Sequence, residues 1–272
     1  MKTLFRDMSR LIYHYLKSKN QREFYRLYDK LGNRNRFEMI RDVKFFKYKF
    51  DIPDAPSFIW QFKDIFVDEV YKFKSEHKIP VIFDCGSNIG TSILYFRQNY
   101  GNAKIIGFEA DENIADICIR NLKRNNINNV NIIKNAVWID DKGVDFSIDG
   151  ADGGSIMNFE NIKRKNSIRL KDYLQKEEII SMLKIDIEGA EHKVLCDCSD
   201  SLGNVENIFI EYHSWNNSDQ KLSEILNILE RNNFRYYIES INKRIQPFIN
   251  QSRDGNMDLQ LNIFGYKLKE AE

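Results

Sequence analysis

Four residues between positions 84 and 109 have the types and the spacing of a nucleotide-binding site. Gly86 and Gly90 bracket a tight turn that directly follows Asp84, and Glu109 ends the next apolar run. Glycine lets backbone amides approach a ligand closely, and an acidic residue about 20 positions further on is where such folds hold a ribose diol. These residues therefore predict a site for an adenosine-containing cofactor, with Glu109 accepting hydrogen bonds from the ribose hydroxyls.

The spacing of the two glycines argues against a dinucleotide. A pyrophosphate-binding turn carries the pattern GxGxxG, whereas this turn reads Gly86-x-x-x-Gly90. Together with Glu109, this spacing favours S-adenosylmethionine, and hence a methyltransferase. Two interpretations of Asp84 stay open. Its side chain lies near the ammonium group of the cofactor, or it caps the turn by accepting hydrogen bonds from the turn's own amides.

Polar residues end five of the strands that the sequence predicts. In open parallel sheets, ligands bind outside the carboxyl ends of the strands. We therefore expect these side chains to meet at one edge of the sheet and to form the active site. The strand-end residues are Asp84, Glu109, Asn135, Asp186, Glu188, Glu211 and His213.

Three of these residues are candidates for acid–base catalysis. Methyl transfer to a hydroxyl group requires removal of the hydroxyl proton by a histidine or carboxylate within hydrogen-bond reach. His213 suits this task by type, because the ordinary pKa of a histidine is about 6.5. Asp186 and Glu188 are the alternatives. The sequence leaves the choice among the three open.

Strands and helices alternate along the part of the chain that carries these residues. After the glycine turn, Thr91 or Ser92 is expected to start a helix. The alternation predicts a doubly wound, mostly parallel α/β sheet. The polar linker 242–258 has no helical pattern, so strands 234–241 and 259–268 are expected to form a hairpin-like return with the last strand antiparallel. The five apolar runs of the parallel part are 81–83, 105–108, 130–134, 180–187 and 205–212.

Positive charge is concentrated in the first 50 residues of the chain. They carry 14 Lys and Arg against 5 Asp and Glu, although the formal net charge of the whole chain is only +1. Residues 1–18 combine this charge with apolar residues at helical spacing, which predicts a basic amphipathic helix. Two interpretations stay open: the helix packs on its own domain, or it lies on a membrane surface.

The first 75 residues are expected to form a mostly helical extension of a catalytic domain at 76–272, because no flexible linker separates the two. A helix is predicted at 20–31, and the alternating pattern of 43–52 predicts one half-buried strand. Ser57 is expected to cap a long helix bearing apolar residues as far as position 73. This extension and the irregular stretch 139–167 are expected to shape the acceptor site.

The cysteines indicate a reduced, cytoplasmic protein. Four cysteines are few for 272 residues, and they lie within predicted strands and helices. Cys196 and Cys198 form a short pair, but no second pair of cysteines or histidines has ligand spacing, so we expect no metal site. If residues 1–18 lie on a membrane, the protein is peripheral to its inner face. No apolar run approaches the ~20 residues that a membrane span needs.

Four segments of the chain resemble the FkbM-type methyltransferase family. They are the turn DCGSNIG at 84–90, FEAD at 108–111, NAV at 135–137 and LKIDIEGAE at 183–191. The likeness covers about residues 80–240, and the last segment is the most specific of the four. The family usually has a proline where this chain has Ala110, a difference that should matter little for ribose binding.

The resemblance implies a fold, an activity and a set of cofactor residues. The fold is the Rossmann-like class I methyltransferase fold with a seven-stranded sheet. The activity is S-adenosylmethionine-dependent O-methylation, commonly of sugars in glycans, glycolipids or secondary metabolites. The cofactor residues that it implies are Asp84, Gly86, Ser87, Asn88, Gly90, Glu109, Ala110, Asn135, Ala136 and Asp186.

We therefore expect an O-methyltransferase for a sugar hydroxyl in a glycan, a surface polysaccharide or a glycolipid. Two alternatives stay open. One is methylation of a secondary metabolite or another small molecule, and the other is a non-catalytic binding module on the same fold. Nucleic acid is not an expected partner, because the core domain lacks a stripe of aromatic and basic residues and an NPPY-like motif.

Overall fold

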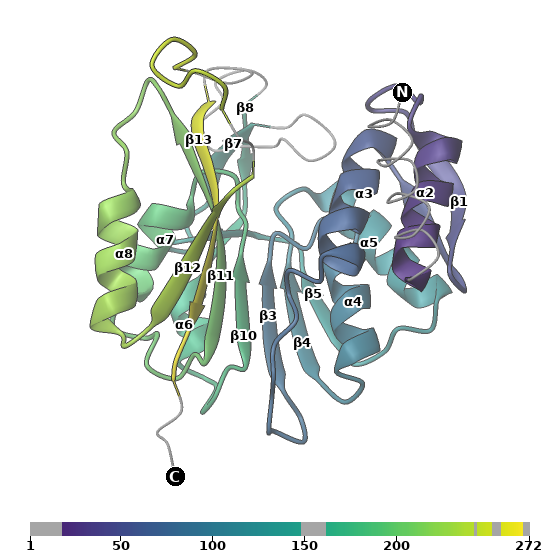
Figure 1. Cartoon of the computed structure of the whole chain (residues 1–272). Coiled ribbons are helices and arrows are strands. Elements are labelled where there is room, and N and C mark those ends of the chain that lie inside the picture. The colour runs from purple at the N-terminus through teal and green to yellow at the C-terminus, as the bar shows by residue number, and fades with distance from the viewer. Residues whose placement is uncertain (1–17, 148–161, 242–243, 252–256, 269–272) are drawn as a thin grey trace.

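A seven-stranded sheet forms the middle of the molecule (Figure 1). The computed structural model describes residues 18–147, 162–241, 244–251 and 257–268. The seven strands are β3 (Val81–Cys85), β4 (Lys104–Phe108), β5 (Val130–Ile133), β10 (Met182–Ile185), β11 (Asn207–Trp215), β12 (Arg235–Ser240) and β13 (Met257–Tyr266).

The strands lie in the order β12-β13-β11-β10-β3-β4-β5. Neighbours from β11 to β5 pair in parallel, whereas β13 is antiparallel to both β11 and β12. The order reverses between β3 and β10, and ligands bind at such a reversal in open α/β sheets. This topology confirms the predicted doubly wound, mostly parallel sheet with an antiparallel last strand. It is the class I methyltransferase arrangement.

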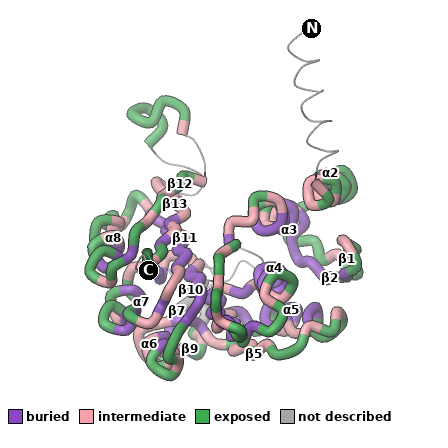
Figure 2. The backbone as a smooth tube through the Cα atoms, turned by 60° about the horizontal axis from the view of Figure 1, so that its bottom comes forward, coloured by how far each residue is buried: buried purple, intermediate pink, exposed green. Residues whose placement is uncertain are grey.

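Helices cover both faces of the sheet (Figure 2). Successive residues of its strands belong alternately to the two buried clusters, one on each face. Ile82 packs with α4 and α5, whereas the adjacent Phe83 packs with α6, α7 and α8. The buried central strands therefore hold the carboxyl edge of the sheet in place. The helices are α4 (Thr91–Asn99), α5 (Glu112–Arg124), α6 (Leu170–Leu174), α7 (Glu191–Cys198) and α8 (Leu222–Arg231).

Two small two-stranded sheets flank the main one. In the first, β6 (Ala136–Trp138) pairs in parallel with β9 (Ser167–Arg169). In the second, β7 (Val144–Ser147) pairs antiparallel with β8 (Ile162–Lys165). Strand β6 follows β5 after two residues, and its first residues, Ala136 and Val137, line the cavity at the carboxyl edge of the main sheet.

The N-terminal extension packs against α4 and α5. It consists of α2 (Lys19–Leu31), β1 (Ile40–Phe45), β2 (Tyr48–Ile52), α3 (Ala55–Phe62) and a π-helical turn (Lys63–Val67). Its buried side chains belong to the same hydrophobic cluster as those of α4 and α5. Asp51 of β2 also lies 2.7 Å from the guanidinium of Arg124 in α5. The bounds of α2 agree with the helix predicted at 20–31.

The prediction of a single strand at 43–52 is wrong. The chain reverses after Phe45, and β1 and β2 form an antiparallel hairpin in which Phe45 lies opposite Tyr48. Phe46 adopts a φ of +48°, and its amide donates to the carboxylate of Glu23 in α2 at 2.7 Å. The alternating pattern continues through the turn, because the aromatic residues on both sides of it face the same core.

The long helix predicted from Ser57 to position 73 is also wrong at both ends. Asp54 caps it instead, because its carboxylate accepts the amide of Ser57 at 3.4 Å. The α-helix gives way to the π-helical turn after Phe62, and that turn ends at Val67. Glu69 then takes a φ of +53°, a conformation that ends a helix.

Two sequence predictions fall mostly outside the described residues. The predicted helix 1–18 is described only at its last residue, and the stretch 139–167 is described only at 139–147 and 162–167. Within the described parts of the chain, we find no helix whose length and apolar character would let it cross a membrane.

Candidate cofactor and acceptor site

A cavity of about 1230 Å³ opens at the carboxyl edge of the sheet. The structure brings almost all of the predicted site residues to this cavity. Two of them, Asp84 and Gly90, are not part of its lining. The predicted residues that line it are Gly86, Ser87, Asn88, Glu109, Ala110, Asn135, Ala136, Asp186, Glu188 and His213.

The glycine turn is held by backbone hydrogen bonds from the neighbouring strand. The amides of Gly86 and Ser87 both donate to the carbonyl oxygen of Phe108 at 2.9 Å. Gly86 has a φ of +85°, and a Cβ atom at this position would lie 1.8 Å from the carbonyl oxygen of Asp186. Only glycine therefore lets the turn pack this closely against the end of β10.

Asp84 lies beneath the turn rather than in the cavity. Its side chain is fully buried, accepts a hydrogen bond from the hydroxyl of Ser92 and lies 3.3 Å from the ammonium of Lys184. These contacts tie β3 to α4 and β10. They favour the turn-fixing role of Asp84, although its partners are side chains and not the turn's amides.

Glu109 stands where the ribose of an adenosine-containing cofactor would lie. Its two carboxylate oxygens accept the amides of Asn88 and Asp111, each at 2.9 Å. Burial raises the pKa of Glu109 to about 7, although the two amide hydrogen bonds oppose this effect. The carboxylate is thus oriented from both sides while it lines the cavity, which fits acceptance of hydrogen bonds from a diol.

Lys184 is a functional residue that our sequence reasoning missed. It lies in β10 and is buried, and its ammonium is 3.3 Å from both Asp84 and Asp186. It also donates to the carbonyl oxygen of Gly86 at 2.9 Å. A lysine within an apolar, fully buried strand was the available signal, since such a residue needs ionic partners.

His213 is enclosed by carboxylates. Its Nδ1 lies 3.2 Å from Glu191, and its Nε2 lies 3.3 Å from Glu211 and 3.6 Å from Glu188. Burial alone would lower the pKa of His213, but these negative charges and hydrogen bonds outweigh it and raise the pKa well above its ordinary value. His213 is therefore protonated at neutral pH, which does not suit the predicted role of proton acceptor.

The carboxylates around His213 differ in their tendency to ionise. Burial, followed by the charge of Glu211, raises the pKa of Asp186 to about 7. Burial also raises the pKa of Glu188 well above its ordinary value. For Glu211, hydrogen bonds and the charge of His213 outweigh burial and lower the pKa. Among these carboxylates, Asp186 is thus the one whose pKa suits a base near neutral pH.

Glu191 is the second residue that sequence reasoning missed. It begins α7 and is fully buried. Its carboxylate accepts the amide of Gly189 at 3.0 Å and that of Ile187 at 3.2 Å. Glu191 therefore fixes both the turn after β10 and the ring of His213. The residue is part of the segment 183–191, but the sequence did not indicate that it turns inward.

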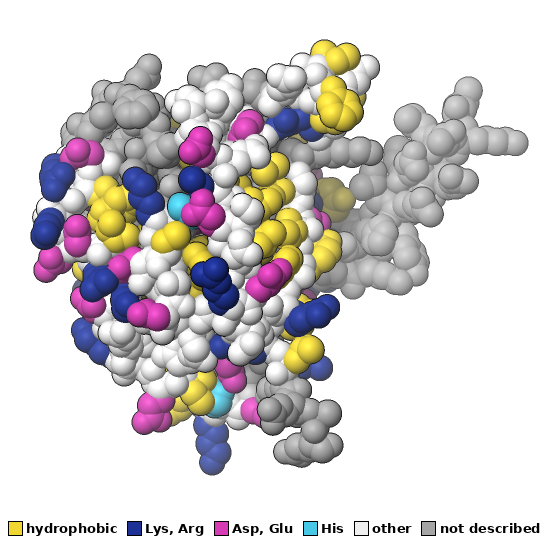
Figure 3. Space-filling view, turned by 90° about the vertical axis from the view of Figure 1, so that its left-hand side faces the viewer, with side chains coloured by type: hydrophobic (Ala, Val, Ile, Leu, Met, Phe, Trp, Pro, Cys, Tyr) yellow, Lys and Arg dark blue, Asp and Glu magenta, His cyan; other side chains and the backbone are white. Residues whose placement is uncertain are grey.

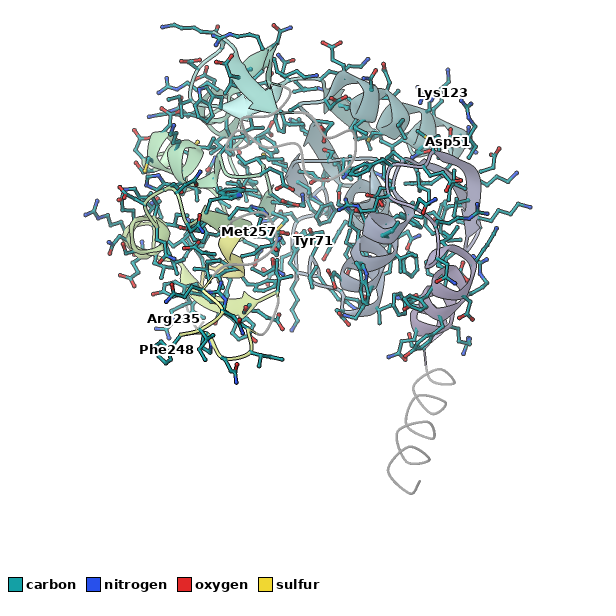
Figure 4. All side chains as sticks on the ribbon, turned by 90° about the horizontal axis from the view of Figure 1, so that it is seen from above. Asp51, Tyr71, Lys123, Arg235, Phe248 and Met257 are labelled. Carbon is teal, nitrogen blue, oxygen red and sulfur yellow. The ribbon has the colours of Figure 1, made fainter. Side chains whose placement is uncertain are left out.

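The remaining lining of the cavity, which would face the acceptor, comes from two parts of the chain that are far apart in sequence. One is α3 and the segment that follows it, which contribute Trp60 and Tyr71. The other is the β12–β13 hairpin, which contributes Tyr237 and Met257. Figure 4 looks down on this edge and shows Tyr71 and Met257 near the middle, between the two halves of the molecule.

The N-terminal extension lines the cavity through residues of α3 and of the segment that follows it, and its role in shaping the acceptor site stays a prediction. The described residues of 139–167 do not line the cavity, and the β12–β13 hairpin does so instead. This contribution was missed because it depends on the antiparallel insertion of β13 beside β11. Strand pairing of this kind is not encoded in any single local pattern.

Comparison with known proteins identifies the same part of the chain. The sequence profile described as "Methyltransferase FkbM domain" matches residues 84–236, more than half of the chain. The curated protein "Methyltransferase sdnD" of Sordaria araneosa is 28% identical over 173 residues, which are 49% of this chain. The match spans 66% of that relative, just under two thirds of its length.

Solved structures with a similar chain trace are distant in sequence. The methyltransferase FkbM of Methylobacillus flagellatus KT is 14% identical, with a TM-score of 0.47, over 73% of this chain and 46% of that one. The TYW2 protein of M. jannaschii, solved with AdoMet, is 14% identical, with a TM-score of 0.43, over 86% of this chain and 89% of that one.

The residues of the cavity fit the cofactor that the family uses. The glycine turn exposes backbone beside the cavity, Glu109 is oriented for a ribose diol, and acidic side chains that suit a positively charged sulphonium line the same cavity. The profile match covers the turn, the ribose acid and the segment 183–191. The chain therefore belongs to the FkbM methyltransferase domain family and is an S-adenosylmethionine-dependent methyltransferase.

Proposed function

We propose that this methyltransferase acts on a hydroxyl group of a sugar, in a glycan, a surface polysaccharide or a glycolipid. The observation that carries the proposal is the composition of the acceptor side of the cavity. It combines exposed aromatic rings, Trp60 and Tyr237, with hydrogen-bonding side chains such as Gln61, Glu239 and Gln260. Sugars present both apolar ring faces and hydroxyl groups, so this combination suits them.

The cofactor would lie between the glycine turn and the strand-end carboxylates. Glu109 would hold the ribose hydroxyls, and the turn at Gly86 to Asn88 would face the methionine part. When bound, S-adenosylmethionine supplies a methyl group on a positively charged sulphur. Asp186, which lines the cavity 3.3 Å from Lys184, places negative charge on this side of the site. The protein thereby positions the donor against an acceptor hydroxyl, which is the main catalytic requirement of such a transfer.

Glu188 is the proposed proton acceptor, in place of His213. It lines the cavity on the left-handed turn after β10, at a φ of +54°. Its side chain is 28% exposed and its contact with His213 is 3.6 Å, the longest of the three carboxylate contacts with that ring. Glu191 accepts backbone amides and Glu211 accepts a hydrogen bond from Gln260, which orients both carboxylates. Protonated His213 would orient Glu188 and the acceptor.

An apolar loop beside the cavity supports an acceptor that is attached to lipid. Residues 244–251 connect β12 and β13, whose ends line the cavity, and the loop extends away from the body of the molecule (Figure 2). Ile245, Phe248 and Ile249 are 75%, 92% and 76% exposed. Figure 3 shows hydrophobic side chains at the upper end of this side of the molecule. We infer that this loop contacts the lipid surface that carries the acceptor.

Transfer of a labelled methyl group tests the proposal. The full chain is incubated with labelled S-adenosylmethionine and a fractionated lysate, and the labelled product is identified by mass. We expect label in a sugar-containing fraction, enriched in lipid extracts. Label in a sugar-free metabolite, in protein or in nucleic acid would contradict the sugar assignment. Cofactor binding without transfer to any fraction would favour a non-catalytic binding module.

A further inference from the structure

We infer that Asp186, Glu211 and His213 form a binding site for a divalent cation of the Mn²⁺ type. The three residues end β10 and lie along β11, and each offers one ligand atom, so that the three atoms lie within 4.8 Å of one another. Both carboxylates and the ring line the cavity at the acceptor side of the cofactor site. The role of the cation in the reaction rests on the proposed function, whereas its binding does not.

The separations are close to those that a bound cation requires. Bonds of about 2.0–2.2 Å from nitrogen and oxygen ligands place neighbouring ligand atoms roughly 3 Å apart. The Nε2 of His213 and the carboxylate of Glu211 are already 3.3 Å apart. The ligand atom of Asp186 lies within 4.8 Å of both and would move closer to enter the same shell. Three protein ligands leave further positions open toward the cavity.

The partner of the second ring nitrogen supports a ligand role for His213. A metal-binding histidine typically donates its other N–H to a carboxylate, which fixes the tautomer and the ring orientation. Glu191 stands at this place, 3.2 Å from Nδ1, and its position is fixed by the amides of Ile187 and Gly189. The Nε2 atom is thereby directed at the carboxylates that line the cavity, and a bound cation would displace the proton that Nε2 carries in the metal-free protein.

The charge of the region also favours a cation. Five carboxylates lie around His213 and Lys184, namely Asp84, Asp186, Glu188, Glu191 and Glu211. The acidic side chains of this group therefore outnumber the basic ones, in a place where burial weakens screening by water. A divalent cation would balance this excess. The competing explanation of this negative charge is that it binds the sulphonium of the cofactor, and titration with Mn²⁺ separates the two explanations.

The ligand types favour Mn²⁺ over Mg²⁺. Two carboxylates suit Mg²⁺ and Mn²⁺, whereas an imidazole ligand is uncommon for Mg²⁺. A cation in this position would bind the acceptor hydroxyl and lower its pKa, so that Glu188 would remove the proton more easily. Vicinal hydroxyls, which sugars commonly present, would fill two open positions at once.

A second group of similar residues provides a matched control. His192, Cys196 and Glu224 also place their ligand atoms within 4.8 Å, on the outer surface of α7 and α8. This outer group has no part in the proposed catalytic site. The variant His192→Asn therefore tests binding at the surface without touching the cavity.

Mn²⁺ titration of the metal-free full chain tests the inference, with the electron paramagnetic resonance signal of free Mn²⁺ as the readout. We expect one Mn²⁺ to bind per chain. Asp186→Asn and Glu211→Gln should abolish this binding, and Glu191→Gln should weaken it by about 10–100-fold. His192→Asn should leave the affinity unchanged. Circular dichroism and thermal melting establish that each variant is folded. Two ligand variants are made so that the loss of Mn²⁺ binding can still be measured if one of them does not fold.

Two results would overturn the inference. One is the absence of Mn²⁺ binding by the wild-type chain, in which case the carboxylates serve the sulphonium alone. The other is binding that survives in Asp186→Asn and Glu211→Gln but is lost in His192→Asn, which would place the cation on the outer surface. Calorimetry of S-adenosylmethionine binding with a chelator present is run in parallel. Cofactor binding that persists there shows that the methyltransferase assignment holds whichever result the titration gives.

Discussion

The two halves of the cavity are built in different ways. The cofactor half comes from consecutive elements, β3, the glycine turn and β4, and is held by backbone hydrogen bonds such as those to the carbonyl of Phe108. The acceptor half joins α3 to the β12–β13 hairpin, which lies more than 170 residues further along the chain. Its surface consists of side chains. We therefore expect the cofactor half to tolerate few substitutions, whereas the side chains of the acceptor half can be substituted without loss of the fold.

The largest expected effect comes from a change in the backbone of the cofactor half. In Gly86→Ala, the new Cβ would lie 1.8 Å from the carbonyl of Asp186, at a φ of +85°. We expect a loss of about 2–5 kcal/mol in the free energy of unfolding, together with loss of cofactor binding. Denaturant unfolding and calorimetry measure the two effects. Gly101→Ala is the matched control, because nothing lies within 4 Å of its Cβ position. Equal stability of the two variants would contradict the account of a rigid turn.

The second largest effect is expected from a substitution of Glu188, at the junction of the cofactor half and the acceptor half. Glu188→Gln keeps the shape of the side chain but removes the proposed proton acceptor. We expect kcat to fall by about 10²–10⁴-fold while the affinity for S-adenosylmethionine stays the same. Single-turnover methyl transfer measures the rate. Glu230→Gln, a change at the end of α8 beside Tyr236, serves as a control for the substitution itself. A kcat within about threefold of the wild type would exclude Glu188 as the base.

The pH dependence of cofactor binding tests the ribose site. Burial raises the pKa of Glu109 to about 7, so the carboxyl is mostly neutral below this pH and accepts hydrogen bonds poorly. We expect the affinity for S-adenosylmethionine to weaken about tenfold between pH 8 and pH 6. Calorimetry at several pH values measures this change. Glu109→Gln should bind weakly at every pH. A pH dependence that persists in this variant would assign the titration to another group.

The smallest effect on activity is expected from a substitution in the acceptor half. Trp60 is 52% exposed and lines the cavity from α3. Trp60→Ala should raise the KM for a sugar acceptor by about 3–10-fold, because a stacked aromatic contributes about 0.5–1.5 kcal/mol. The KM for S-adenosylmethionine should stay unchanged, which steady-state kinetics with each substrate varied in turn can measure. An equal change in both KM values would show that the two halves are not independent.

The errors in the sequence-based predictions occur where distant residues decide the local structure. The turn at Phe46 depends on Glu23, which caps its amide from another helix. Ser57 has the residue type of a helix cap, but the carboxylate of Asp54 occupies the capping position. By contrast, the strands and helices of the sheet were predicted well, because their hydrophobic periodicity reflects burial on a regular element.

The sequence alone determined the family, the cofactor and the order of the elements. These properties depend on residues that are close together in the chain, such as the glycine turn and the segment 183–191. Only the tertiary structure decided that His213 is protonated, that Lys184 joins β3 to β10 and that Glu191 turns inward. The physical reason is that ionisation depends on burial and on charges a few ångströms away. The strands and the helix bring these charges together from separate parts of the chain.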